Sequence, residues 1–226
     1  MKVAIVTGAA GNLGRAVVEK FTTGGYQVIG TVTKEEEKTS TKSYQAEVVN
    51  LVEEQAAADF VKKVIEQHGQ IDVAVLTAGG FAMGSIKDTS AADIMKQYKL
   101  NFETAYNIAR PVFTQMLQQK SGRIFLVGSK PGLDARNGKG MAAYGLAKSL
   151  LFRLAELMND EAKGHNVVTG VVVPGTIDTP PNRQSMPDAD FSKWVKPETI
   201  AAIIHYYCSE EAGVLREPVI KVYGNA

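Results

Sequence analysis

The chain has 226 residues, and its 45% hydrophobic and 22% charged residues match the globular average, which argues against disordered and fibrous classes. The 25 Lys and Arg residues nearly balance 24 Asp and Glu residues, and a net charge of +1 argues against nucleic-acid binding. One cysteine and three scattered histidines give neither an internal disulfide nor an ordinary metal site, so we expect no metal and a reducing cytoplasm.

Predicted strands and helices alternate along the whole chain. Strands are predicted at residues 3–6, 27–32, 43–48, 71–76, 123–127, 167–173 and 219–222, and helices at 13–21, 51–68, 90–119, 142–162 and 197–208. The strands are nearly continuous apolar runs, which is typical of a parallel sheet buried on both faces. We therefore expect one α/β domain over residues 1–226, with a doubly wound, mostly parallel sheet of about seven strands and helices on both faces.

Residues 174–196 form the longest stretch without a clear helical or strand pattern. A compact domain rarely uses more than about 15 residues for a connection, and longer ones are often lids or binding loops. We therefore interpret this segment as a substrate lid.

A glycine-rich turn lies between the first strand and the first helix. Gly8 and Gly11 allow a tight turn whose N–H groups can approach a phosphate, and Gly14 permits close packing of helix on strand. A dinucleotide pyrophosphate binds at this position in doubly wound folds. The spacing is Gly-x-x-Gly-x-x-Gly, not the ordinary Gly-x-Gly-x-x-Gly, so a plain turn without a ligand stays open here.

Three polar residues in the middle of the chain favour acid–base chemistry. Tyr144 and Lys148 are four residues apart, on one face of a predicted helix, and Ser129 follows the preceding strand. A nearby ammonium lowers the pKa of a phenol, and a serine hydroxyl can polarise a carbonyl. Taken alone, a Tyr-x-x-x-Lys pair on a helix is usually a surface contact.

These motifs, in this order, resemble the short-chain dehydrogenase/reductase family over essentially the whole chain. The resembling segments are the turn 7–14, Thr77-Ala78-Gly79 after the fourth strand, Asn101, the trio Ser129, Tyr144 and Lys148, and the loop 174–179. The resemblance implies a Rossmann fold and an NAD(P)-dependent oxidoreductase. Asn12 and Thr77 depart from the family pattern, which usually has glycine and asparagine there.

The resemblance also implies roles. Tyr144 would be the general acid/base, Lys148 would bind the nicotinamide ribose and lower the pKa of Tyr144, Ser129 would orient a carbonyl, and Asn101 would hold a proton-relay water. The cofactor-binding residues implied are Gly8, Gly11, Asn12, Leu13, Gly14, Thr33, Lys34, Glu47, Val48, Ala78, Gly79, Tyr144, Lys148, Pro174, Gly175, Ile177 and Thr179. The family's packing of its two long helices implies a homodimer or homotetramer.

The end of the second strand favours NADP over NAD. Val32 stands where an acidic residue would bind the adenosine ribose of NAD. Thr33 and Lys34 could donate hydrogen bonds to a 2′-phosphate. We therefore expect NADP, with NAD as the alternative.

Within the family, segments 78–84, 130–134 and 177–194 are similar to the dihydropteridine reductases. That similarity implies a flat heteroaromatic or quinonoid small-molecule substrate, packed by Phe81, Met186 and Trp194, although apolar lid residues often serve packing alone. A non-catalytic NAD(P)-binding regulator on the same fold is the alternative function. No apolar run approaches the roughly 18 residues of a membrane span, so we expect no membrane partner. The nearly balanced charge argues against nucleic acid as a partner.

Overall fold

The strands form a parallel sheet in the computed structural model, which describes residues 1–225. In chain order they are β1 Val3–Thr7, β2 Gln27–Val32, β3 Tyr44–Val48, β4 Val73–Leu76, β5 Ser121–Val127, β6 Asn166–Pro174 and β7 Val219–Val222. Their spatial order is β3-β2-β1-β4-β5-β6-β7, and each pairing is parallel. The predicted seven-stranded doubly wound fold is confirmed, with parallel pairing throughout these strands.

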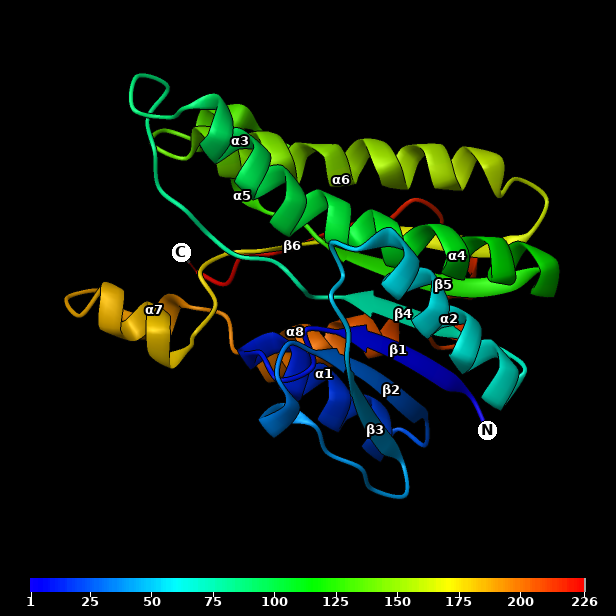
Figure 1. The fold of residues 1–226 in the computed structure, drawn as a ribbon. Helices are drawn as coiled ribbons and strands as arrows, with labels where there is room; N and C mark the ends of the chain where they lie inside the picture. The colour runs from blue at the N-terminus through cyan, green and yellow to red at the C-terminus, as the bar shows by residue number, and fades with distance from the viewer. Residues whose placement is uncertain (226) are drawn as a thin grey trace.

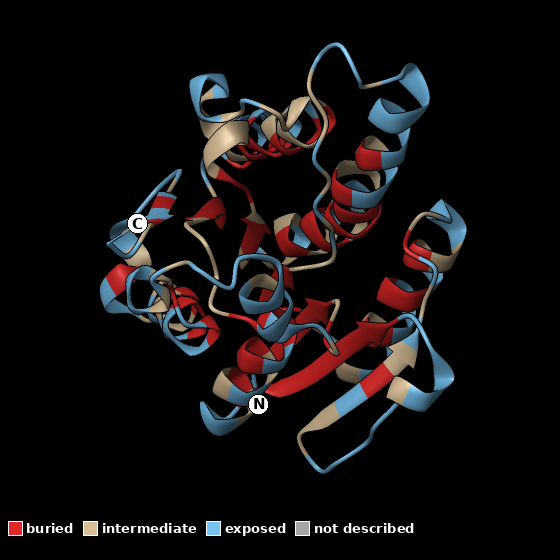
Figure 2. Ribbon diagram, turned by 90° about the vertical axis from the view of Figure 1, so that its left-hand side faces the viewer, coloured by how far each residue is buried: buried red, intermediate tan, exposed pale blue. Residues whose placement is uncertain are grey.

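Helices cover both faces of this sheet (Figure 1). They are α1 Asn12–Thr23, α2 Glu54–His68, α3 Ala91–Tyr98, α4 Thr104–Gln119, α5 Lys130–Leu133, α6 Ala142–Glu161, α7 Pro180–Ser185 and α8 Pro197–Tyr206. Side chains of α2, α4 and α6 share one core cluster, and those of α1 and α8 share the other. Figure 2 shows the central strands and the facing sides of these helices mostly as buried, whereas the edge strands β3 and β7 are only partly buried.

The predicted helix over residues 90–119 is interrupted by a π-helical turn at residues 99–103. Single-turn π insertions are frequent at functional sites. A π-helical turn contains about one residue more than an α-helical turn. The apolar spacing on either side of it still fits a helix, so the hydrophobic pattern did not reveal the interruption. The turn carries Asn101, whose side chain is buried.

The stretch 174–196 is not irregular throughout, and that expectation was wrong. It contains α7, whose N-cap is Thr179 and whose first residue is Pro180. The adjacent Pro180 and Pro181 would interrupt the middle of a helix. Proline is well suited to the first helical position, however, and Pro180 stands there. A second difference lies in α2, which begins at Glu54 rather than at residue 51.

The strand order reverses between β1 and β4, so the crevice outside their carboxyl ends is where an open α/β sheet binds ligands. In Figure 1 these ends point toward the side of the molecule that carries α5 and α7. No helix among residues 1–225 is long and apolar enough to span a membrane.

Candidate active site

The turn after β1 has the shape expected of a phosphate-binding loop. Gly8 has a φ of +61°, a left-handed conformation that favours glycine. A Cβ on Gly14 would lie 2.1 Å from the carbonyl oxygen of Gly8, so a side chain at Gly14 would push α1 away from the turn. Gly11 is the N-cap of α1, and no side chain of the described chain caps this helix. Its first N–H groups therefore remain available for an anion.

Thr77 links the two strands that border the crevice. Its hydroxyl donates a 2.6 Å hydrogen bond to the carbonyl oxygen of Thr7 at the end of β1. In return, the backbone N–H of Ala78 donates to the Thr7 hydroxyl at 3.1 Å. Thr77 stands where the family pattern usually has asparagine. Its side chain connects the carboxyl ends of β1 and β4.

The three predicted catalytic side chains lie together at the end of β5. Ser129 is buried at the N-cap of α5, where its Oγ accepts a 3.1 Å hydrogen bond from the Gly132 N–H. Lys148 on α6 lies with its Nζ 5.9 Å from the centre of the Tyr144 ring. Burial raises the pKa of the Tyr144 phenol, and a hydrogen bond with the Ser129 side chain lowers it in part.

Lys148 is a buried ammonium. Desolvation lowers its pKa from 10.5 to about 8, and Nζ donates a 2.8 Å hydrogen bond to the carbonyl oxygen of Val127. The resemblance led us to expect Lys148 to lower the pKa of Tyr144, yet the groups that shift the phenol here are its own burial and Ser129. The position fits an ammonium that needs a further polar partner, because a buried charge is costly when poorly hydrogen-bonded.

Asn101 joins this group from the π turn. Its Nδ2 donates to Gln97 Oε1 at 3.0 Å, and its Oδ1 accepts from the Gly80 N–H at 3.1 Å. A Cβ added to Gly79 would lie 2.7 Å from Asn101 Oδ1 and 3.4 Å from Lys148 Nζ. Gly79 therefore brings the loop after β4 into direct contact with both polar side chains. Gln97, which orients Asn101, was missed in the sequence, although its spacing of four residues could have indicated it.

The apolar side chains predicted to pack the substrate are only partly brought together. Phe81 is 60% exposed, and its ring meets Tyr144 edge-on, with 5.0 Å between centroids. Met186 is partly exposed just after α7. Trp194 packs instead on Phe191, with 4.7 Å between the ring centroids.

The residues that follow β6 are held by local hydrogen bonds. The Gly175 N–H donates to Val222 O at 2.8 Å, and Ile177 O accepts from the Asn182 side chain, also at 2.8 Å. Thr179 is buried and accepts from the Asn182 N–H. An ion pair within this segment, Arg183 with Asp178, was not predicted. These contacts fix the loop after Pro174 at the carboxyl end of β6.

The residues predicted to bind the adenosine half already have partners within the chain. Thr33 and Lys34 both donate to the carboxylate of Glu37. Glu47 forms a 2.9 Å ion pair with Lys63, and the neighbouring Val48 is exposed.

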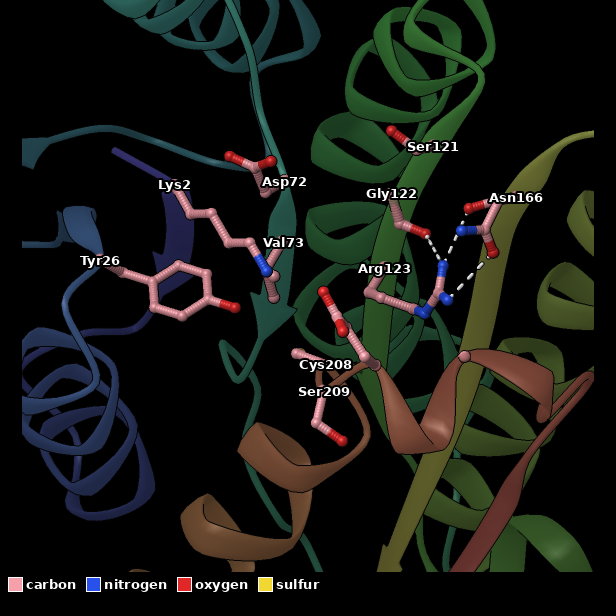
Figure 3. Close-up of a pocket in the computed structure, with 12 residues that line it drawn as sticks. Lys2, Tyr26, Asp72, Val73, Ser121, Gly122, Arg123, Asn166, Cys208 and Ser209 are labelled. Carbon is pink, nitrogen blue, oxygen red and sulfur yellow. Dashed lines mark hydrogen bonds between the residues drawn. The ribbon is translucent and has the colours of Figure 1, made fainter.

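A cavity of about 340 Å³ lies at the end of the sheet opposite to the predicted site (Figure 3). Its lining includes Lys2, Tyr26, Asp72, Arg123 and Cys208, and none of the residues predicted to bind cofactor or substrate. This end of the sheet carries the amino ends of the strands, whereas ligands of open α/β sheets bind at the carboxyl ends. The cavity therefore does not mark the catalytic centre. No cluster of His, Cys, Asp and Glu suited to a metal ion is found in residues 1–225.

A doubly wound sheet with a glycine turn at its switch point and a grouped Ser, Tyr and Lys, of which the Ser and the Lys are buried, defines a dinucleotide-dependent oxidoreductase. The family model for short-chain dehydrogenases matches residues 2–190. The chain belongs to the short-chain dehydrogenase family and is an NAD(P)-dependent oxidoreductase.

Relatives of similar length agree with this assignment. An acetoacetyl-CoA reductase from Acinetobacter sp. (strain RA3849) is 28% identical, over 99% of this chain and 96% of the relative. A 3-oxoacyl-[acyl-carrier-protein] reductase FabG from Thermotoga maritima is 26% identical, over the same shares. A cyclic-di-GMP-binding biofilm dispersal mediator protein from Escherichia coli K12 is 27% identical, over 93% of this chain and 91% of the relative. The crystal structure of gox2181 shares the fold, with a TM-score of 0.89 and 24% identity, covering 99% of this chain and 94% of that one.

Proposed function

We propose that the protein uses NADPH to reduce a carbonyl group or a flat quinonoid heteroaromatic ring, in the manner of a dihydropteridine reductase. One observation supports the aromatic substrate class: the exposed ring of Phe81 stands edge-on to Tyr144, beside the proposed proton donor. A planar substrate could pack against this ring, with Met186 on the lid as a further apolar contact. Residues 1–226 act as one catalytic domain, with 174–196 as the substrate lid.

The cofactor supplies the hydride, and the chain's own residues bind and orient the reactants. Gly8, Gly11, Asn12, Leu13 and Gly14 hold the pyrophosphate with their N–H groups. The other residues proposed to bind the cofactor are Thr33, Lys34, Glu47, Val48, Ala78, Gly79, Tyr144, Lys148, Pro174, Gly175, Ile177 and Thr179.

The proton moves at Tyr144 Oη. The Ser129 hydroxyl, which lowers the pKa of that phenol, orients the substrate carbonyl or imine. Lys148 hydrogen-bonds the ribose of the nucleotide, and Asn101 holds a water that can replace the proton. Ser129 and Lys148 are buried, which limits the access of bulk water to this transfer.

A substrate panel with NADPH and NADH tests the proposal. We expect turnover of quinonoid dihydropterin, with NADPH preferred, to exceed turnover of simple ketones and of acetoacetyl-CoA. Fast turnover of acetoacetyl-CoA alone would overturn the aromatic class and favour the carbonyl substrates named for two of the relatives.

A non-catalytic regulator is the alternative, because the name of one relative describes a nucleotide-binding mediator protein. A regulator that only binds a nucleotide has no need for a buried Ser129 and a buried Lys148 grouped with Tyr144. Binding of dinucleotide without turnover of any panel substrate would support the regulator.

We expect a homodimer or homotetramer. Leu146, Leu150 and Leu157 lie along one side of α6 and are 52%, 37% and 63% exposed. Exposed apolar stripes of this kind mark protein–protein contacts. The neighbouring Leu151 and Leu154 are in the core and are not available for this contact. Sedimentation at low micromolar concentration is expected to give a dimer or larger, and Leu157→Asp to shift it toward monomer. A wild-type monomer of 24.3 kDa would contradict the expectation.

A further inference from the structure

The turn after β2 is occupied by a carboxylate of the same chain. Glu37 Oε2 accepts hydrogen bonds from the Thr33 N–H at 3.1 Å, the Thr33 hydroxyl at 3.2 Å and the Lys34 N–H at 3.2 Å. The Thr33 N–H is the largest of the influences that lower the pKa of Glu37, so the group is an anion at neutral pH. The donors expected to hold a 2′-phosphate therefore already hold a negative charge.

A cavity of about 460 Å³ borders this turn. It runs from Ala9 and Ala10 of the glycine turn to Glu36, Glu37 and Lys38, so it joins the pyrophosphate end of the crevice to the occupied donors.

Arg15 lines this cavity from α1, and its guanidinium makes no hydrogen bond or ion pair with the part of the chain that is described. The Lys38 ammonium, by contrast, is paired with Glu35 at 3.0 Å. Tyr44 lines the same cavity; burial raises the pKa of its phenol, and the positive charge of Arg15 lowers it in part. The cavity therefore has an unpaired cation on one side and an anion-occupied set of donors on the other.

We propose that Glu37 is a specificity-determining residue that occupies the place of the NADP 2′-phosphate and must leave when NADP binds. The inference rests on the proposed function only in taking this cavity as the adenosine end of the cofactor site. Two anions cannot share the same three donors, so the phosphate of NADP competes with Glu37, while NAD, which lacks it, leaves Glu37 in place.

The same arrangement explains how NADP can still bind. A phosphate monoester carries about twice the charge of a carboxylate and has more acceptor oxygens. It can bond to the turn and to Arg15 together, whereas Glu37 is seen bonded only to the turn. Glu37 therefore reduces the preference for NADP without abolishing it.

Isothermal titration calorimetry of the full chain with NADPH and with NADH tests this role without relying on turnover. Glu37→Gln keeps the shape but removes the charge, so we expect NADPH affinity to rise at least fivefold and NADH affinity to change less than twofold. Glu36→Gln is the matched control, because it removes the same charge from the same cavity lining without a bond to the turn donors. It should change the ratio of the two affinities less than twofold.

Arg15→Ala provides an independent measurement, with an expected loss of at least fivefold in NADPH affinity and an unchanged NADH affinity. Equal gains from Glu37→Gln and Glu36→Gln would overturn the specific role, because they would reflect general charge alone. A loss of NADPH affinity in Glu37→Gln would also overturn it, by showing that Glu37 supports the turn for the cofactor. If neither dinucleotide bound the wild type, the proposed function would fail as well.

Discussion

Tyr144→Phe is expected to lower turnover of a carbonyl or quinonoid substrate by at least ~10²-fold, with dinucleotide affinity within twofold of wild type. The substitution removes the proton donor and its hydrogen bond with Ser129 but keeps the ring that packs against Phe81. Steady-state kinetics with the best panel substrate and titration calorimetry with NADPH measure the two quantities.

Tyr206→Phe is a suitable control for this experiment. Tyr206 is an exposed tyrosine at the end of α8, so the same loss of a hydroxyl should leave turnover unchanged. If Tyr144→Phe kept turnover within threefold of wild type, Tyr144 would not be the acid/base. A fall in both turnover and cofactor affinity would show that the hydroxyl of Tyr144, and not only its ring, takes part in the proposed binding of the dinucleotide.

Hydrophobic patterning was sufficient to predict the fold. Most of the seven strands are apolar runs in the sequence, such as β4 at Val73–Leu76, and each of the seven is paired in the sheet. Parallel strands that are buried on both faces need such runs, so the pattern of apolar residues along the chain predicts where these strands lie and that they are parallel. The boundaries were less accurate, because Leu51 is buried in the core although α2 begins only at Glu54.

Local contacts between polar side chains limited the prediction of the site. Ser129, Tyr144 and Lys148 could be placed because strand ends and helical spacing determine where they lie. The partner of Thr33 and Lys34 could not be predicted, because the carboxylate that accepts from their N–H groups comes from a short 3₁₀ turn at residues 35–37. Residues 35, 36 and 37 are all glutamates, and nothing in their spacing showed which one folds back.

The π turn is a similar case. Asn101 was identified by resemblance alone, while its burial and its bonds to Gln97 and Gly80 depend on one extra residue in a helical turn. Sequence periodicity averages over several turns and does not resolve such an insertion.

Lys148→Met is expected to reduce turnover at least ~10²-fold and yet to make the protein more stable at pH 7. A lowering of the Lys148 pKa from 10.5 to about 8 corresponds to a cost of about 3 kcal/mol for burying the ammonium. Removing the ammonium recovers this cost but leaves the Val127 carbonyl without its donor, a loss of about 1–3 kcal/mol. We expect a net gain of about 1 kcal/mol in the free energy of unfolding.

The pH dependence distinguishes this cause from simple repacking. Below pH 8 both the folded and the unfolded chain carry a protonated Lys148, so the full cost is present. Between pH 8 and 10.5 the unfolded state binds more protons, so the stability of the wild type rises relative to Lys148→Met and the advantage of the variant disappears. Urea unfolding across this range measures the difference, with Lys62→Met, a 73% exposed helical lysine, as the control. An advantage of Lys148→Met that stayed constant from pH 7 to 10.5 would show that apolar packing, not relief of a buried charge, stabilises the variant.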